Sequence, residues 1–191
     1  LVRKAKKIAQ NNVNKLRDII SEKTPMIGIE PSSLLSFRDE YPSLVSEDIS
    51  ELNKHIYLFD EFFAKEIASN NITQSQFTET ETKILLHGHC QQKAIIGGEH
   101  MIKMLSLPKN YTVEYIPSGC CGMAGSYGYE KKNYQMSKQI ADLVLTKAIN
   151  KAEESTIISA PGTSCREQIK HFTKRTALHP IEIMYNALKT K

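Results

Sequence analysis

The four cysteines are the residues of this 191-residue chain best suited to chemistry. One ends the run His87-Gly88-His89-Cys90, two are adjacent at Cys120-Cys121, and the last is Cys165. Thiolates are ligands of zinc and of iron–sulfur clusters, and a thiol with a lowered pKa also attacks disulfides. The residue types and their grouping therefore indicate either a metal centre or a reactive dithiol.

The composition narrows the class of protein. Apolar residues make up 40% and charged residues 24%, which is typical of a globular protein with a core. No run of eighteen apolar residues occurs, so we expect no membrane span. The net charge of +4 is spread over helical patterns, so we expect no nucleic-acid partner. Four cysteines are too few for a disulfide scaffold, which favours a reducing, cytoplasmic location. A chain that begins at Leu1 without a leader pattern suggests a piece of a longer polypeptide.

Short apolar runs alternate with helical patterns along the chain. The expected strands are 26–29, 83–87, 112–116 and 155–159. Helical spacing of apolar residues covers 2–20, 46–68, 91–105 and 132–149. A capping box, Ser164-x-x-Glu167, predicts a helix that starts at Cys165, and Pro180 predicts the start of the last helix. This alternation predicts an α/β fold with an open, mainly parallel sheet flanked by helices.

The predicted strands explain where the cysteines come together. Cys90, the pair Cys120-Cys121 and Cys165 each follow one of the last three strands. Right-handed crossovers bring the carboxyl ends of parallel strands to one edge, where open α/β sheets bind ligands. We therefore expect all four sulfurs at one edge of one sheet. We expect the segment 30–33, after the first strand, at the same edge.

Several chemical interpretations of that edge remain open from the residues alone. Glycines at 122, 125 and 128 would let backbone amides approach a bulky inorganic group. His89 is a further candidate ligand, whereas His87 is expected to be a structural hydrogen-bonding group. Buried cysteines also serve simply as small core residues. An iron–sulfur cluster, a zinc ion and a metal-free dithiol all fit the pattern.

Three segments resemble a known family, namely 87–94, 118–130 and 162–169. They contain the runs His-Gly-His-Cys, Cys-Cys-Gly-Met and Gly-Thr-Ser-Cys, and weaker similarity at 29–42 and 178–182 extends the match over most of the chain. The chain is similar to the C-terminal cysteine-rich (CCG) domain of FAD-linked oxidases. These include iron–sulfur 2-hydroxyacid dehydrogenases of the D-lactate and D-2-hydroxyglutarate type. Related proteins are the iron–sulfur subunit of glycolate oxidase and a cysteine-rich subunit of heterodisulfide reductase.

The resemblance implies an iron–sulfur-binding electron-transfer domain with Cys90, Cys120, Cys121 and Cys165 as cluster ligands. Its alternative is a zinc-binding structural or thiol-redox domain of the same type of enzyme. It implies that residues 1–75 are the end of a first CCG repeat and 76–191 a second repeat. FAD and ferredoxin-like domains would lie upstream, and the intact enzyme would use an electron acceptor and could sit at a membrane periphery. The chain alone would not be catalytically complete. It departs from the family at Ser33 and Gly162, where relatives often have cysteine.

Overall fold

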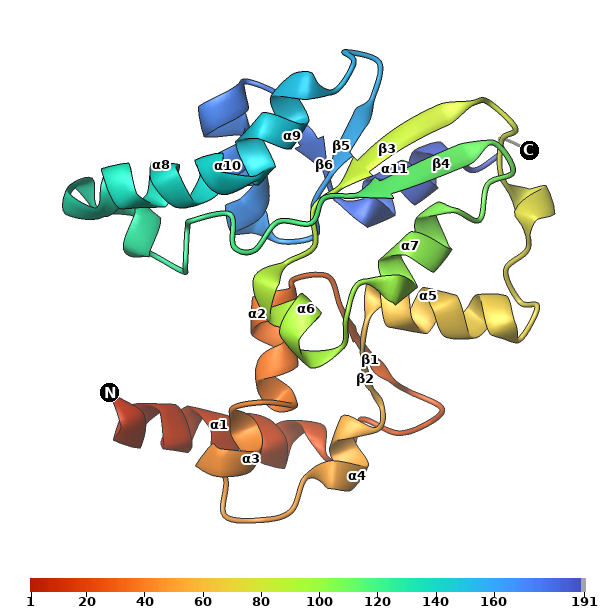
Figure 1. Ribbon diagram of the computed structural model, residues 1–191. Helices are drawn as coiled ribbons and strands as arrows, with labels where there is room; N and C mark the ends of the chain where they lie inside the picture. The colour runs from red at the N-terminus through yellow and green to blue at the C-terminus, as the bar shows by residue number, and fades with distance from the viewer. Residues whose placement is uncertain (190–191) are drawn as a thin grey trace.

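The computed structural model describes residues 1–189 and has an α/β fold (Figure 1). The strands are β1 (Met26–Gly28), β2 (Ile56–Leu58), β3 (Thr82–Leu86), β4 (Tyr111–Tyr115), β5 (Ile157–Ser159) and β6 (Ala177–Leu178). The helices are α1 (Val2–Leu16), α2 (Pro31–Leu34), α3 (Tyr41–Leu44), α4 (Ser50–Asn53), α5 (Phe59–Ala68), α6 (Cys90–Ile95), α7 (Glu99–Leu105), α8 (Tyr134–Leu143), α9 (Leu145–Lys151), α10 (Thr163–Thr173) and α11 (Pro180–Asn186). Short 3-10 turns lie at Leu35–Phe37, Gln74–Gln76, Tyr127–Tyr129 and Lys131–Asn133. Among the residues described, no helix is long and apolar enough to cross a membrane.

The larger sheet confirms the predicted parallel architecture. Its strand order is β4-β3-β5-β6, and every neighbouring pair is parallel. Side chains on β3 alternate between two cores, as the pleat requires. Ile84 and Leu86 pack with residues of α5, α7 and α11, whereas Leu85 packs with residues of α9 and α10. Helices therefore cover both faces, and the carboxyl ends of the strands are left as the edge from which the cysteine-bearing segments start.

The first predicted strand does not join this sheet. β1 pairs with β2 in a separate two-stranded parallel sheet, so the placement of segment 30–33 at the edge of one common sheet is wrong. β2 was hidden within the predicted helix 46–68. Ile56 and Leu58 are buried while Tyr57 between them is only partly covered, which is the burial pattern of a strand. The apolar spacing that resembled one helix is instead divided among α4, β2 and α5.

Two other predicted helices are each broken in two. The helix expected over 91–105 is interrupted between α6 and α7, where Gly97 has φ of 78°. The helix expected over 132–149 breaks at Val144, whose φ of −137° and ψ of −51° are not helical. The capping box at Ser164 is also wrong, because α10 already begins at Thr163 and its N-cap is Gly162. The last helix begins as predicted, with Pro180 in its first turn.

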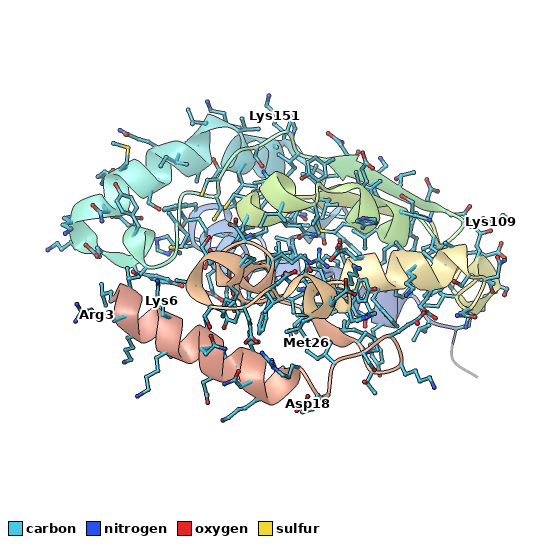
Figure 2. The ribbon with its side chains drawn as sticks, turned by 90° about the horizontal axis from the view of Figure 1, so that it is seen from below. Arg3, Lys6, Asp18, Met26, Lys109 and Lys151 are labelled. Atoms are coloured by element: carbon cyan, nitrogen blue, oxygen red, sulfur yellow. The ribbon has the colours of Figure 1, made fainter. Side chains whose placement is uncertain are left out.

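Lysines are spread over the surface rather than gathered on one face. Figure 2 shows Arg3 and Lys6 on α1 at one side of the molecule, and Lys109 and Lys151 at distant points around it. Seven ion pairs occur among residues 1–189, and most of them join exposed side chains. This distribution agrees with the solvated surface expected from the interspersed charges.

One succession of elements occurs twice in the fold. β1 leads into α2, and β2, its parallel neighbour, leads into α5; in the same way β5 leads into α10, and β6 leads into α11. Ser33 and Cys165 each occupy the third position of the helix that follows the first strand. The second helix is capped alike in both cases. The Leu58 N–H donates to Glu61 at 2.8 Å, and the His179 N–H donates to Glu182 at 2.7 Å.

Candidate metal centre

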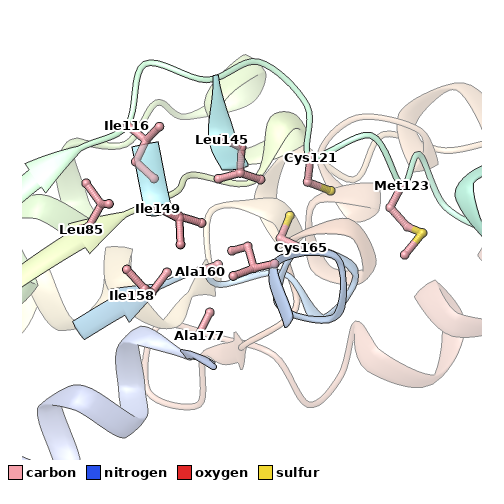
Figure 3. Close-up of a cluster of buried hydrophobic side chains, with 11 residues drawn as sticks. Leu85, Ile116, Cys121, Met123, Leu145, Ile149, Ile158, Ala160, Cys165 and Ala177 are labelled. Carbon is pink, nitrogen blue, oxygen red and sulfur yellow. The ribbon is translucent and has the colours of Figure 1, made fainter. Parts of the chain in front are cut away.

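The elements around the larger sheet bring the predicted cysteines together. Cys90 is the first residue of α6, directly after β3, and Cys165 lies in the first turn of α10, after β5. Cys120 and Cys121 follow β4 in an extended loop. Cys121 and Cys165 lie at one end of a cluster of buried apolar side chains (Figure 3). The four cysteines differ in solvent exposure: Cys121 and Cys165 are buried, Cys120 is partly exposed and Cys90 is exposed.

A compact group of potential metal ligands forms the buried end of this set. Ligand atoms of His87, Cys121 and Cys165 all lie within 4.8 Å of one another, and all three side chains are buried. Zinc–ligand bonds of about 2.0–2.3 Å in a tetrahedron place neighbouring ligand atoms roughly 3.5–3.8 Å apart. The three donors are therefore spaced closely enough to share one metal ion after small adjustments.

His87 is held so that one ring nitrogen is left for this group. Its Nδ1 is hydrogen-bonded to Ser118 Oγ at 2.7 Å, and the side chain is 0% exposed. Its Nε2 is buried and has no hydrogen-bond partner among residues 1–189. A buried, unpaired ring nitrogen is costly unless a ligand satisfies it. His87 thus stands in the arrangement of a metal-binding histidine whose other nitrogen is fixed by a neighbouring group.

His89, the histidine named from the sequence as a further candidate, lies beside the group and outside it. A Cβ added to Gly162 would lie 2.5 Å from His89 Cδ2 and 3.3 Å from Cys165 Sγ. The absence of a side chain at Gly162 thus lets His89 rest against the start of α10. His89 Nδ1 is buried and without a hydrogen-bond partner in the described part of the chain.

The loop that carries the cysteine pair depends on Gly122. Its φ is 92°, and a Cβ at this position would lie 2.2 Å from the Ser137 carbonyl oxygen. The Gly122 N–H donates to Cys120 Sγ at 3.3 Å. Gln168, buried on α10, donates to the Cys121 carbonyl at 3.0 Å and to Ser137 Oγ at 2.7 Å. The loop is therefore clamped between α8 and α10, with a backbone amide directed at a sulfur.

The four sulfurs share protons along a chain. Hydrogen bonds from Cys121 and then Cys90 lower the pKa of Cys120. Cys90 is the donor in its bond to Cys120, and this raises the pKa of Cys90. A hydrogen bond from Cys121 also lowers the pKa of Cys165, with His87 adding to the effect. The pKa of Cys121, the donor to both neighbours, is raised. The shifts of opposite direction show that the four sulfur groups interact closely, and a metal ion that binds to them would displace their protons.

Glu30 is a contributor that sequence reasoning did not single out. Its carboxylate accepts hydrogen bonds from the Thr163 N–H at 2.9 Å and from the Thr163 hydroxyl at 2.8 Å, at the start of α10. Although burial opposes it, these bonds hold the pKa of Glu30 below its usual value. Glu30 comes from the β1–α2 junction, so the smaller sheet fixes the helix that carries Cys165. Only its position after a strand hinted at this role.

The donor set fits a soft or borderline metal centre. Four thiols, one buried and unpartnered imidazole nitrogen and a backbone amide directed at a sulfur converge within one region of the fold. Such donors are typical of zinc sites and of iron–sulfur sites. Cys90 and Cys120 lie outside the compact group of three, so the described residues form a buried half-site flanked by a more accessible pair of thiols.

Comparison with known proteins relates the chain to dehydrogenases. It is 30% identical over 166 residues to D-2-hydroxyglutarate dehydrogenase of Escherichia coli (strain K12), a match that covers 86% of this chain and 16% of the relative. The corresponding enzyme of Haemophilus influenzae is 26% identical over 190 residues, with 96% and 18% covered. One subunit of the anaerobic glycerol-3-phosphate dehydrogenase of Escherichia coli (strain K12) is 26% identical over 186 residues, with 97% and 46% covered.

The chain therefore spans less than half the length of each of these relatives. No family model matches it, and no solved structure is significantly similar. The similarity is consistent with the FAD-linked oxidase relationship expected from the motifs. The relatives are dehydrogenases or subunits of one, and the chain itself has a potential His/Cys/Cys metal-binding group.

Proposed function

We propose that this chain is an iron–sulfur-binding electron-transfer part of a larger dehydrogenase, of the kind represented by the CCG domain. Cys90, Cys120, Cys121 and Cys165 are the proposed cluster ligands. The observation that carries the proposal is the buried His87 Nε2, left without a partner beside Cys121 and Cys165 in the described part of the chain. Most buried polar atoms in native proteins have a partner, so an unpaired ring nitrogen beside two buried thiols points to a ligand.

A bound iron–sulfur cluster would accept and release single electrons. The residues of the chain prepare the place for it. The Gly122 amide, directed at Cys120 Sγ, stabilises negative charge on that sulfur. Burial of Cys121 and Cys165 excludes water from one side, while the exposed Cys90 leaves the other side open to a redox partner. His87 serves as a further ligand or as a hydrogen-bond donor to a sulfur.

The organisation of the intact protein is part of the proposal. The greater length of the relatives supports additional domains in the intact protein, and we propose that these are upstream FAD and ferredoxin-like domains that act on a 2-hydroxy acid. The repeated succession of elements supports a division into residues 1–75, as the end of a first CCG repeat, and 76–191, as a second. Ser33 then stands where the second repeat has Cys165, so the first repeat would lack one thiol.

A single zinc ion is the second candidate occupant. The spacing of His87, Cys121 and Cys165, within 4.8 Å of one another, favours one metal ion in the buried half. Cys120 or a water molecule would complete a tetrahedral site, which would be structural if closed and would activate a ligand if open. In that case Cys90 would remain free for thiol exchange.

Anaerobic purification followed by assay of iron, acid-labile sulfide and zinc separates these candidates. The cluster predicts a brown protein in which iron and sulfide are present in similar amounts. One zinc ion per chain without acid-labile sulfide would show that the site binds zinc and not an iron–sulfur cluster. A colourless, metal-free protein that also fails to take up iron and sulfide, or zinc, under reducing conditions would overturn both.

Substitution of one ligand tests the assignment of residues. Cys121→Ser should remove most of the bound metal, because a buried hydroxyl is a poor ligand for iron or zinc. The control is Ser33→Ala, which changes the position in α2 that corresponds to Cys165 in α10 and should leave the metal content unchanged. Full metal content in Cys121→Ser would show that the ligand set is wrong.

A further inference from the structure

Lys93 is fastened to the backbone that leads into the cysteine pair. It lies three residues after Cys90, in the last turn of the short helix α6. Its Nζ donates to the Gly119 carbonyl at 2.6 Å and also to the Ser118 carbonyl. The hydroxyl of Ser118 is in turn hydrogen-bonded to His87 Nδ1 at 2.7 Å. The ammonium group of Lys93 therefore holds both the backbone that precedes the cysteine pair and Ser118, the residue that orients His87.

The stem of Lys93 is confined rather than free in solvent. A Cβ added to Gly88 would lie 3.2 Å from Lys93 Cδ and 2.1 Å from the Tyr115 hydroxyl oxygen. The bare backbone of Gly88 thus allows both side chains to pack closely over it. Since the stem is packed and two of the three ammonium protons are engaged, the positive charge has a fixed position.

The charge of Lys93 has no carboxylate partner among the described residues. None of the ion pairs found within residues 1–189 includes this side chain. Burial lowers the pKa of Lys93, and the cysteine groups of the site, Cys90, Cys165, Cys120 and Cys121, act in the opposite direction. A partly buried charge is stable only if it is paired. The negative charge that pairs with Lys93 is therefore that of the sulfur site.

We propose that Lys93 is a positioning residue of the sulfur site, which holds the 118–119 backbone and supplies the positive charge that makes the site select a net anionic metal centre. The inference rests on the proposed function for the identity of that centre. A centre carries net negative charge when its thiolate ligands outnumber the positive charges of the metal, as four thiolates around a divalent ion do.

The first test measures the local charge without any metal. Cys90 of the reduced, metal-free chain is alkylated with iodoacetate and, separately, with iodoacetamide. The ratio is the rate with the anionic iodoacetate divided by the rate with the neutral iodoacetamide. Both reagents attack the thiolate, so the ratio of the rates cancels the thiolate fraction and reports the local electrostatic potential. At low salt, Lys93→Met should lower the ratio about fivefold, since a unit charge at contact distance in water contributes about 1 kcal/mol.

The matched controls separate charge from packing. Lys93→Arg keeps the charge and should keep the ratio near that of the wild type, whereas Lys93→Gln keeps donor groups without charge and should behave like Lys93→Met. Lys103→Met removes an exposed lysine on α7 and gives the same change in net charge. It should leave the ratio unchanged. A role in packing alone would disturb Lys93→Arg and would not follow the charge.

The second test uses zinc alone, in competition with a chelator of known affinity. Because Zn²⁺ adds positive charge to a site whose negative charge already faces Lys93, loss of the Lys93 charge in Lys93→Met should strengthen zinc binding about fivefold, and Lys93→Arg should bind zinc like the wild type. If the wild type binds neither zinc nor iron but the alkylation ratio falls in Lys93→Met, the proposed function fails and the charge role of Lys93 stands. If metal binds and Lys93→Met changes neither the ratio nor the affinity, the inference about Lys93 is overturned.

Discussion

Three glycines in the cysteine loop allow backbone strain and steric overlap to be measured separately. Gly119 has no positive φ, and a Cβ added there meets nothing within 4 Å. Gly125 has φ of 66° but also open space around a Cβ. Gly122 combines φ of 92° with a Cβ position 2.2 Å from a backbone carbonyl oxygen. Alanine at each position therefore adds one penalty at a time.

The expected losses of stability follow from those features. Gly119→Ala should change the free energy of unfolding by less than about 0.5 kcal/mol, as most surface substitutions do. Gly125→Ala should cost about 1–2 kcal/mol, because a side chain in the left-handed region meets its own carbonyl. Gly122→Ala should cost about 2–5 kcal/mol, because overpacking adds about 1–3 kcal/mol to the same strain.

Urea denaturation of the metal-free, reduced chain, followed by circular dichroism, measures the series. The metal content after reconstitution should fall in the same order, since the Gly122 N–H that donates to Cys120 must move when the loop relaxes. Equal stability of Gly122→Ala and Gly119→Ala would refute the reasoning, since it would mean that the loop is not clamped against Ser137. Equal losses for Gly122→Ala and Gly125→Ala would refute the steric part alone.

Three further predictions concern single side chains. His87→Ala should weaken zinc binding at least tenfold in a chelator competition, whereas His171→Ala, on the exposed later part of α10, should not; equal affinities would remove His87 from the site. Burial raises the pKa of Asp60 to about 7, so the stability that this group contributes is complete at low pH and is lost as the pH rises towards neutrality. Asp60→Asn should therefore be more stable than the wild type at pH 8 by ~2–4 kcal/mol, and much less so at pH 4, in urea denaturation. Burial raises the pKa of Glu30, but hydrogen bonds from Thr163 outweigh it and lower that pKa, so the stability that Glu30 contributes is present at neutral pH and is lost as the pH falls through its folded-state pKa. Glu30→Gln should therefore destabilise the chain at pH 7 and match the wild type near pH 3. A difference in the free energy of unfolding that stays constant with pH would contradict this.

Much of the architecture was predictable because local patterns and topology rules agree. The strands expected at 26–29, 83–87, 112–116 and 155–159 all form, within two residues at their ends. The placement of the cysteines followed from a general property of parallel sheets, namely that their strands end at one edge. The sequence therefore predicted three of the four strands of the larger sheet and the position of the cysteines after them, without any knowledge of distances.

The elements that were missed are short or are set by distant contacts. β2 and β6 contain only three and two residues, too few for a period of two to stand out. The breaks at Gly97 and Val144 interrupt patterns that remain helical on either side. Tertiary packing overrides local periodicity at such places.

The histidines show the same limit at the site. The sequence favoured His89 over His87 as a ligand, and nothing local distinguishes the two. What sets His87 apart is the hydroxyl of Ser118, thirty-one residues further along the chain, which engages one ring nitrogen and leaves the other facing the sulfurs. A long-range contact of this kind cannot be read from spacing.

The graded exposure of the four sulfurs also sets the order in which the site would be damaged. Cysteines that oxidants reach easily are the first to form sulfenic acid and then irreversible acids, whereas burial protects a thiol. Oxygen or peroxide would therefore reach Cys90 before Cys121 and Cys165. We expect a protein oxidised at Cys90 to keep His87, Cys121 and Cys165 unmodified. These three residues could still bind one metal ion after the complete set of four cysteines is lost. The oxidative history of a sample would then decide whether its complete set of sulfur ligands is still available.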